Sequence, residues 1–201
     1  MTKVLATAGI AALLLTGCGK YEESLKILPT EIAQADECKN TNKSFELDCY
    51  DLISYKNSIA ILRLGLQDYK KGNYKEAFGR YSFAKSRGNF YANSLLADLY
   101  NKGRGVPQSQ KIALELLQDV DSVDPIAAYK LSFYYMNKKD YSEVEDLLEF
   151  AASNNIKDAQ LRLSKLYKEG THIKADDKKA ELWMSKYNDG SQDFIKKIYG
   201  H

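Results

Sequence analysis

The sequence has little proline, little histidine and little net charge. Of its 201 residues three are Pro and two are His, and 29 Lys and Arg nearly balance 27 Asp and Glu. This balance excludes a typical nucleic-acid-binding protein, which needs a cationic excess to bind phosphates. With 12 Gly and 44% hydrophobic residues, the chain is neither collagen-like nor of low complexity. Its length allows one or two domains that fold without metal or disulfide support.

Motifs for catalysis and cofactor binding are also missing. The sequence contains no G-x-S-x-G, H-E-x-x-H, P-loop or Rossmann glycine pattern. His172 precedes Asp176 and Asp177, but no motif places a nucleophile near it, so a solvated loop histidine is favoured over a proton relay. We expect no enzyme activity, no cofactor, no metal site and no small-molecule substrate.

The first 17 residues have the composition of a secretory signal. Lys3 gives a positive start, and the apolar run after it, about a dozen residues, is too short for a stable transmembrane helix. The sequence Leu-Thr-Gly-Cys at 15–18 resembles the lipobox of bacterial lipoprotein precursors. The resemblance implies that Cys18 is lipidated and becomes the first residue after cleavage. An ordinary cleaved signal with an incidental cysteine is the alternative.

The lipobox resemblance also implies a location. Lipoproteins kept in the inner membrane resemble one another in having Asp after the cysteine, whereas this chain has Gly19. We therefore expect a lipid anchor at Cys18 in the outer membrane, because several acyl chains bind a bilayer far more firmly than one. The folded part would face the periplasm, with exposure at the cell surface as the alternative.

Two further cysteines, Cys38 and Cys49, follow in the chain. In an oxidising compartment an even pair usually closes a disulfide. The two residues do not form a C-x-x-C redox pair, and no His or further Cys stands at metal-ligand spacing. We expect a structural disulfide, and two free thiols are the alternative.

The body of the chain repeats one pattern four times: Ala, then Leu four residues later, then a small residue. The four copies are Ala60/Leu64/Gly65, Ala92/Leu96/Ala97, Ala127/Leu131/Ser132 and Ala159/Leu163/Ser164. This spacing places Ala and Leu on one helical face, and the small residue lets a neighbouring helix approach closely. A second helical pattern follows each copy after a polar turn, so the sequence predicts an array of helix pairs.

The units resemble two known repeat families. The first and third look like tetratricopeptide repeats, best seen in Leu64-Gly65, Gly72, Tyr74, Ala77, Tyr81 and Ala84 of the first. The second and fourth look like Sel1-like repeats, seen in Leu96, Leu99-Tyr100, Gly103, Gly105-Val106 and Ala113, and in Leu163, Leu166-Tyr167, Gly170, Ala180 and Trp183. The resemblance implies an all-α fold, a right-handed α-solenoid of about four antiparallel helix pairs with a C-terminal capping helix.

The expected organisation divides the whole chain. We expect a signal peptide at 1–17, a lipidated N-terminus and tether at 18–42, an N-terminal helix at 43–56, repeats at 57–89, 90–123, 124–155 and 156–189, and a capping helix at 190–201. The last segment continues the repeat register and carries Lys196 and Lys197 among apolar residues, so we expect it to close the end of the stack.

In such an array the first helix of each unit lines the concave face. The register predicts that the following residues project from it: Leu66, Tyr69, Tyr91, Ser94, Asp98, Asn101, Tyr129, Phe133, Met136, Leu161, Lys165 and Lys168. Four of them, Tyr69, Tyr91, Tyr129 and Phe133, would form an aromatic stripe, and large rings are common anchors at interfaces. For each ring, packing between successive helices is the alternative.

These features predict an outer-membrane-anchored periplasmic lipoprotein that acts as a scaffold or adaptor for an envelope assembly. Its partner would be another envelope protein or a peptide segment. The chain resembles scaffold lipoproteins of exopolysaccharide export and those that help secretion or pilus pores assemble. A regulator of peptidoglycan enzymes and a surface-exposed binder of a host factor are the alternatives.

Overall fold

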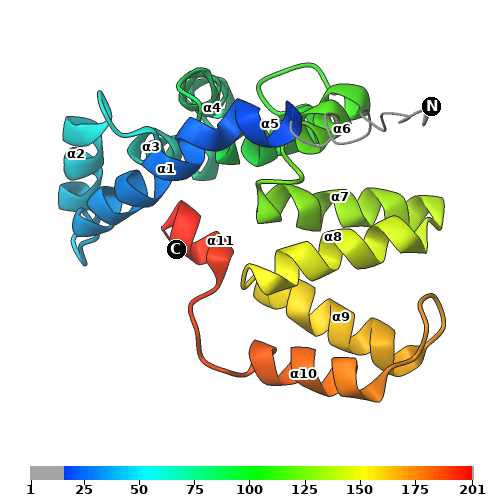
Figure 1. Cartoon of the computed structure of the whole chain (residues 1–201). Coiled ribbons are helices and arrows are strands. Elements are labelled where there is room, and N and C mark those ends of the chain that lie inside the picture. The colour runs from blue at the N-terminus through cyan, green and yellow to red at the C-terminus, as the bar shows by residue number, and fades with distance from the viewer. Residues whose placement is uncertain (1–15, 201) are drawn as a thin grey trace, which may run out of the picture.

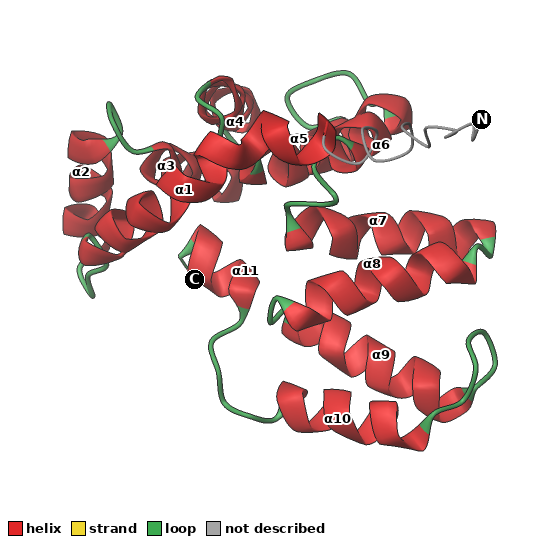
Figure 2. Ribbon diagram, viewed as in Figure 1, coloured by secondary structure: helices red, strands yellow, loops and turns green. Residues whose placement is uncertain are grey.

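The computed structural model describes residues 16–200, and every regular element in that part of the chain is an α-helix (Figure 1). Figure 2 shows helices joined by loops, as the sequence predicts for an all-α solenoid. Most of the expected signal peptide, 1–15, lies outside the described residues, and so does the side chain of Cys18. No helix in the described part is long and apolar enough to cross a membrane.

Eight helices form four pairs, one pair in each range that the sequence assigns to a repeat. They are α3 (Ser58–Lys70), α4 (Tyr74–Ser86), α5 (Tyr91–Lys102), α6 (Gln110–Gln118), α7 (Pro125–Lys138), α8 (Tyr141–Ser153), α9 (Lys157–Glu169) and α10 (Asp177–Tyr187). Each helix packs on the one before it and the one after it, which builds the stack. We call α3, α5, α7 and α9 the first helices of their units, and the face that they form the inner face.

The small residue after each repeated Leu lies where helices meet closely. Gly65 of α3 faces Tyr81 of α4, and a Cβ atom added to this glycine would stand 2.6 Å from Cε1 of the tyrosine ring. Ala97, Ser132 and Ser164 hold the same position in the other units and are buried. A larger side chain at these positions would push the paired helices apart.

Most of the N-terminal segment is a docked helix, whereas the sequence predicts a tether for 18–42 with only a short helix around Glu31 to Cys38. α1 (Thr16–Glu37) is 22 residues long and packs on α3. It buries Leu28 and Ile32, which lie four positions apart on one helical face. The sequence does not predict a helix of this length because Pro29 lies inside it, and proline usually interrupts a helix.

A disulfide joins Cys38 to Cys49, as the sequence predicts, and the two Cα atoms lie 5.5 Å apart. The bond links the end of α1 to α2 (Lys43–Ile53), which also packs on α3. Tyr50 of α2 is buried, and its hydroxyl accepts a hydrogen bond from Arg63 of α3 at 3.3 Å. The first repeat is thus covered by two N-terminal helices that are covalently joined.

The C-terminal helix exists as predicted, but it does not cap the last unit. α11 (Phe194–Tyr199) turns back across the inner face and packs on α3, where Figure 1 shows it in red beside the first helices of the chain. Ile198 is 0% exposed and Tyr199 6%. The reason is Arg63, which is 2% exposed and donates a hydrogen bond to the carbonyl oxygen of Ile198 at 3.3 Å. A buried guanidinium needs such acceptors, and α11 supplies them.

Candidate protein-binding surface

The inner face has a covered part and an open part. The segment 188–199, which we call the strap, runs from α10 back to α3 and covers the inner face near the beginning of the first helices. We call this region the covered part. The rest of the inner face, toward the ends of the first helices, is the open part. The structure places Tyr91 and Ser94 in the covered part and the other predicted residues in or beside the open part.

The strap is held at both ends by specific hydrogen bonds. At its beginning, the carboxylate of Asp193 accepts from the backbone N–H of Lys157 at 2.9 Å, and the backbone N–H of Phe194 donates to the carbonyl of Asn155 at 3.0 Å. At its end, Arg63 donates to the carbonyl of Lys197 at 3.0 Å and to the carboxylate of Asp36 in α1 at 2.6 Å. These contacts fasten the last repeat to the first.

Tyr91 lies beneath the strap, contrary to its predicted place on an open concave face. Its ring packs against Phe90, with centroids 4.4 Å apart, and against Phe194 of α11, at 6.0 Å. The hydroxyl of Tyr199 donates to the Tyr91 carbonyl at 3.3 Å. Burial raises the pKa of the Tyr91 hydroxyl well above its usual value. This ring anchors the strap and has no surface left for a partner.

Ser94 is also buried, so its predicted place among the partner-binding residues is wrong as well. Its hydroxyl donates to Asp124 at 2.7 Å. Asp124 is the N-cap of α7, and its other carboxylate oxygen accepts from the backbone N–H of Ile126 at 2.9 Å. Burial raises the pKa of Asp124 to about 6, although these hydrogen bonds and the nearby Lys130 charge oppose the shift. Ser94 and Asp124 thus join the second unit to the third.

Asp98 of α5 stands at the border of the open part and is paired. Lys130 of α7 donates to the Asp98 carboxylate at 2.6 Å and to the Ser94 carbonyl at 2.8 Å. The predicted acidic spot is therefore neutralised by a lysine from the neighbouring unit. This ion pair connects α5 with α7, and it leaves Asp98 without a free negative charge for a partner.

Tyr69 of α3 packs at the outer edge of the open part. Its ring meets Tyr74 edge-on, with centroids 5.2 Å apart, and the Arg104 guanidinium lies 5.3 Å from its centroid. Arg104 also donates a hydrogen bond to the Tyr69 hydroxyl. Leu66, one turn earlier, is half-buried against the core. Both predicted residues therefore contribute more to packing than to an exposed stripe.

Phe133 of α7 lies at the centre of the open part. Its ring meets Tyr129 edge-on, with centroids 5.0 Å apart, and the Arg162 guanidinium of α9 lies 4.6 Å above its centroid. Arg162 also donates to the sulfur of Met136 at 3.7 Å. Three predicted residues, Tyr129, Phe133 and Met136, therefore meet around one arginine, and all three are half-buried.

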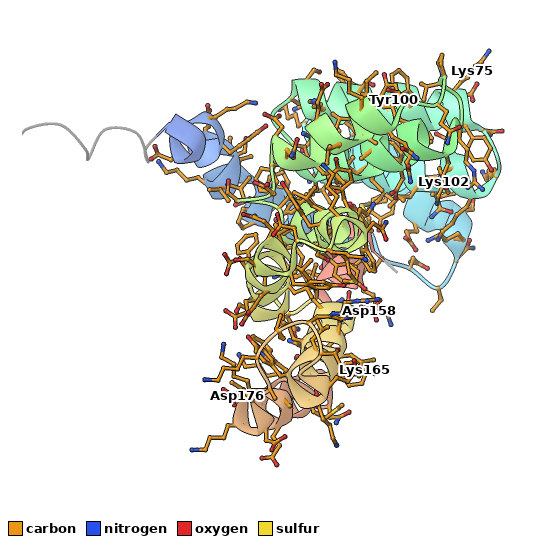
Figure 3. The ribbon with its side chains drawn as sticks, turned by 90° about the vertical axis from the view of Figure 1, so that its right-hand side faces the viewer. Lys75, Tyr100, Lys102, Asp158, Lys165 and Asp176 are labelled. Atoms are coloured by element: carbon orange, nitrogen blue, oxygen red, sulfur yellow. A yellow bond between two sulfur atoms is a disulfide. The ribbon has the colours of Figure 1, made fainter. Side chains whose placement is uncertain are left out.

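The cationic end of the predicted surface lies on α9. Lys165 and Lys168 are exposed, and Leu161 is half-buried. Figure 3 shows Lys165 and Asp158 projecting from the same side of α9. Lys165 and Asp158 also line a shallow hollow of about 390 Å³ together with Tyr129.

A larger cavity of about 510 Å³ opens between α5, α6 and α7. Its lining combines apolar, charged and aromatic side chains. The residues are Ala97, Asp98, Asn101, Gln110, Ala113, Leu114, Leu117, Lys130, Phe133, Tyr134, Asn137 and Lys138. A cavity of this size on rigid helices can hold one or two large side chains of a bound chain.

Sequence reasoning missed three residues that shape the open part: Lys130, Tyr134 and Arg162. Tyr134 carries the Lys138 ammonium 4.6 Å from its ring centroid, and Arg162 covers Phe133. The spacing of Arg162 and Lys165, three positions apart on one helix, could have indicated that both share a face. The contact of Lys130 with Asp98 depends on the crossing of two units and has no signal in the sequence.

Comparison with known proteins agrees with this geometry. The Sel1 repeat family matches residues 90–118 and 157–186, which lie in the second and fourth units. No curated protein matches the chain. A solved structure of a protective antigen present in uropathogenic Escherichia coli strains, displaying an SLR fold, is 23% identical with a TM-score of 0.59 and is matched over 83% of this chain and 39% of that one.

A solved Sel1 repeat protein from Oxalobacter formigenes is similar at 19% identity with a TM-score of 0.61, over 75% of this chain and 46% of that one. The chain therefore spans less than half the length of either protein. Identities this low show the fold alone. Two units match the Sel1 repeat, and most of the chain shares the fold of solved Sel1-repeat proteins. The chain is therefore an all-α solenoid of a kind that typically serves protein–protein interaction.

Proposed function

We propose that the protein is an outer-membrane-anchored periplasmic lipoprotein that binds a segment of another envelope protein on the open part of the inner face. The observation that carries this proposal is a cavity of about 510 Å³ that Phe133, Tyr134 and Lys138 help to line. The Arg162 guanidinium lies 4.6 Å from the centroid of the Phe133 ring. Aromatic and arginine side chains on rigid helices are typical anchors of protein interfaces. The protein acts as an adaptor and carries out no reaction of its own.

The docked α1 helix supports a particular arrangement at the membrane. If the lipidated chain begins at Cys18, the helix starts at the anchor and leaves almost no free tether. Lys20 pairs with Asp119, at the end of α6, at 2.5 Å, and Tyr21 packs edge-on against Phe90 with centroids 5.6 Å apart. The solenoid would therefore lie against the membrane surface with its second unit next to the lipid. A partner would be held close to the outer membrane.

A site-specific crosslink tests the binding surface. A photoreactive phenylalanine analogue at Phe133, in the open part, should give one discrete adduct in living cells. The same analogue at Leu182, which is exposed on α10, is the matched control and should give none. Adducts of equal yield at both positions, or at Leu182 alone, would contradict the proposal.

The identity of the captured protein separates the candidate assemblies. An export, secretion or pilus component supports the adaptor role, whereas a cell-wall hydrolase or synthase supports regulation of peptidoglycan enzymes. Digestion of the protein by protease added to whole cells would favour the surface-exposed binder of a host factor.

The membrane anchor has its own test. Cys18→Ser should abolish incorporation of labelled fatty acid and move the protein from the membrane fraction to the soluble periplasmic fraction. An unchanged distribution would contradict lipidation at this residue.

A further inference from the structure

Large apolar side chains are exposed mainly in the N-terminal elements of the described part. On α1, α2, the turn after α2 and α4 they are Leu25, Ile27, Phe45, Leu52, Tyr55 and Phe83, whereas α6 and α10 carry only Ile112, Leu182 and Tyr187. One exposed apolar side chain is ordinary on a protein surface. A group of them indicates a surface that contacts another molecule.

Three of these side chains surround Arg87, which follows α4. Ile27 is 46% exposed, Tyr55 69% and Phe83 55%. The Arg87 guanidinium lies 5.9 Å from the Phe83 ring centroid and donates to the Tyr55 carbonyl at 2.7 Å. Arg87 and Ile27 line one hollow of about 340 Å³, and the Lys56 ammonium lies 5.2 Å from the Tyr55 ring centroid. We call these five residues the Arg87 patch.

The Arg87 patch has a positive charge. Among the described residues, neither Arg87 nor Lys56 forms an ion pair within 4.0 Å. Two carboxylates line the hollow. Glu31 is buried and accepts from the backbone N–H of Ser58 at 2.9 Å, so only Glu23 is exposed to solvent. The patch therefore presents two cations beside three exposed apolar side chains.

α1 connects this patch to the predicted lipid anchor. Cys18 and Ile27 belong to the same helix, and nine residues of α-helix span about 13 Å. Lys20, which follows Cys18 by two positions, lines the same hollow as Arg87. Because Leu28 is buried, α1 is fixed on the body of the protein. A bilayer that holds a lipid on Cys18 is therefore close to the patch.

We propose that the Arg87 patch lies in the headgroup region of the membrane that holds Cys18. Ile27, Tyr55 and Phe83 enter the boundary between headgroups and acyl chains, and Arg87 and Lys56 bind lipid phosphates. This inference rests on the proposed function and adds a second contact with the membrane. Exposed apolar and aromatic side chains next to Lys and Arg are the combination that binds bilayer interfaces. A protein partner fits less well, because the anchor holds the patch close to the bilayer.

Quenching of tryptophan fluorescence by brominated phospholipid tests the inference. The lipidated protein is reconstituted into vesicles of phosphatidylethanolamine with about a quarter phosphatidylglycerol, which supplies anionic headgroups. Phe83→Trp places a reporter in the patch, and Leu182→Trp, at an exposed position of α10, is the matched control. The unsubstituted protein corrects for Trp183. We expect bromine on the acyl chains to quench the first reporter by at least about half and the second by less than about a tenth.

Charge substitutions then test the role of the two cations. Lys56→Gln together with Arg87→Gln, made in the Phe83→Trp protein, should lower the quenching at least about twofold while leaving the helical circular dichroism unchanged. Lys174→Gln together with Lys178→Gln removes the same charge from exposed positions near α10 and should have no effect. Equal loss from both pairs would overturn the inference, since it would indicate attraction by net charge alone.

The remaining outcomes separate this inference from the proposed function. If Cys18 incorporates labelled fatty acid but the Phe83→Trp reporter is not quenched, the inference is wrong and the proposed function stands. If Cys18 is not lipidated, the proposed membrane anchor fails as well. A discrete protein adduct from a photoreactive analogue at Phe83 in living cells would also overturn the inference, because a partner protein or a second copy of the chain would then cover the patch.

Discussion

The covered and open parts of the inner face are built from the same repeated helices, yet they have different roles. In the covered part the buried Arg63 has partners within the chain, namely Asp36 and the strap carbonyls. In the open part Arg162 and Lys138 lie over aromatic rings, and among the described residues neither forms an ion pair within 4.0 Å. Satisfied polar groups indicate structure, whereas unpaired charges on an accessible, rigid surface indicate recognition.

The largest effect should come from removing the strap's helix. Ending the chain at Asp189 exposes the site of Phe194, Ile198 and Tyr199 and should lower the free energy of unfolding by about 5 kcal/mol, from about 1.5–3 kcal/mol for each buried apolar side chain. Urea unfolding followed by circular dichroism measures the loss. The yield of the crosslink from Phe133 should change less than about twofold. A complete loss of this crosslink in the folded, shortened protein would show that the two parts form one site.

Removing the disulfide should have the next largest effect. Replacing Cys38 and Cys49 by Ser frees the link between α1 and α2, and should cost about 3 kcal/mol in the loop-entropy description of such bonds. Hydrogen exchange should increase around Tyr50 of α2 and Arg63 of α3, because α1 and α2, which cover α3, are no longer joined. Exchange in α7 and α9 should stay the same. Uniform acceleration along the chain would mean that the two parts are not independent.

The smallest effect concerns pH and lies at the junction of the second and third units. Because burial raises the pKa of Asp124 to about 6, the folded state binds a proton more readily than the unfolded state. Stability from this group is therefore present at low pH and is lost as the pH rises through about 6. Asp124→Asn removes this dependence.

Between pH 4 and pH 7 the wild type should lose about 2 kcal/mol relative to the Asp124→Asn variant. Paired denaturant titrations at the two pH values measure it. Parallel stability curves for the two proteins would show that the carboxyl is not perturbed by burial.

The sequence was sufficient to predict the repeats but not the course of the chain ends. Ala60, Leu64 and their counterparts recur because each unit must bury the same helical face, and that local requirement is visible as spacing. The strap depends on a contact between Arg63 and Ile198, which are 135 positions apart. No local sequence pattern indicates such a contact. From the sequence alone, the short amphipathic segment that forms α11 is therefore predicted to cap the last repeat.

The same distinction applies to the candidate site. Phe133, Tyr129 and Met136 could be assigned from the register, because their direction follows from their helix alone. Tyr91 could not, since its burial depends on α11. The contact of Arg162 with Phe133 could not be predicted either. A long flexible side chain has many possible conformations, and the packing of the third unit against the fourth decides which one forms.

The strap also affects how the molecule is made. A linear repeat array can begin to fold anywhere and grows by contacts between neighbours. Here one set of contacts joins the first unit to residues that follow the last unit, so these contacts form only after the whole array has been synthesised. Contacts between such distant residues are slow to form. Until then Arg63 and Tyr91 lack the partners that the strap supplies, so an unfinished molecule differs from a finished one at these two residues.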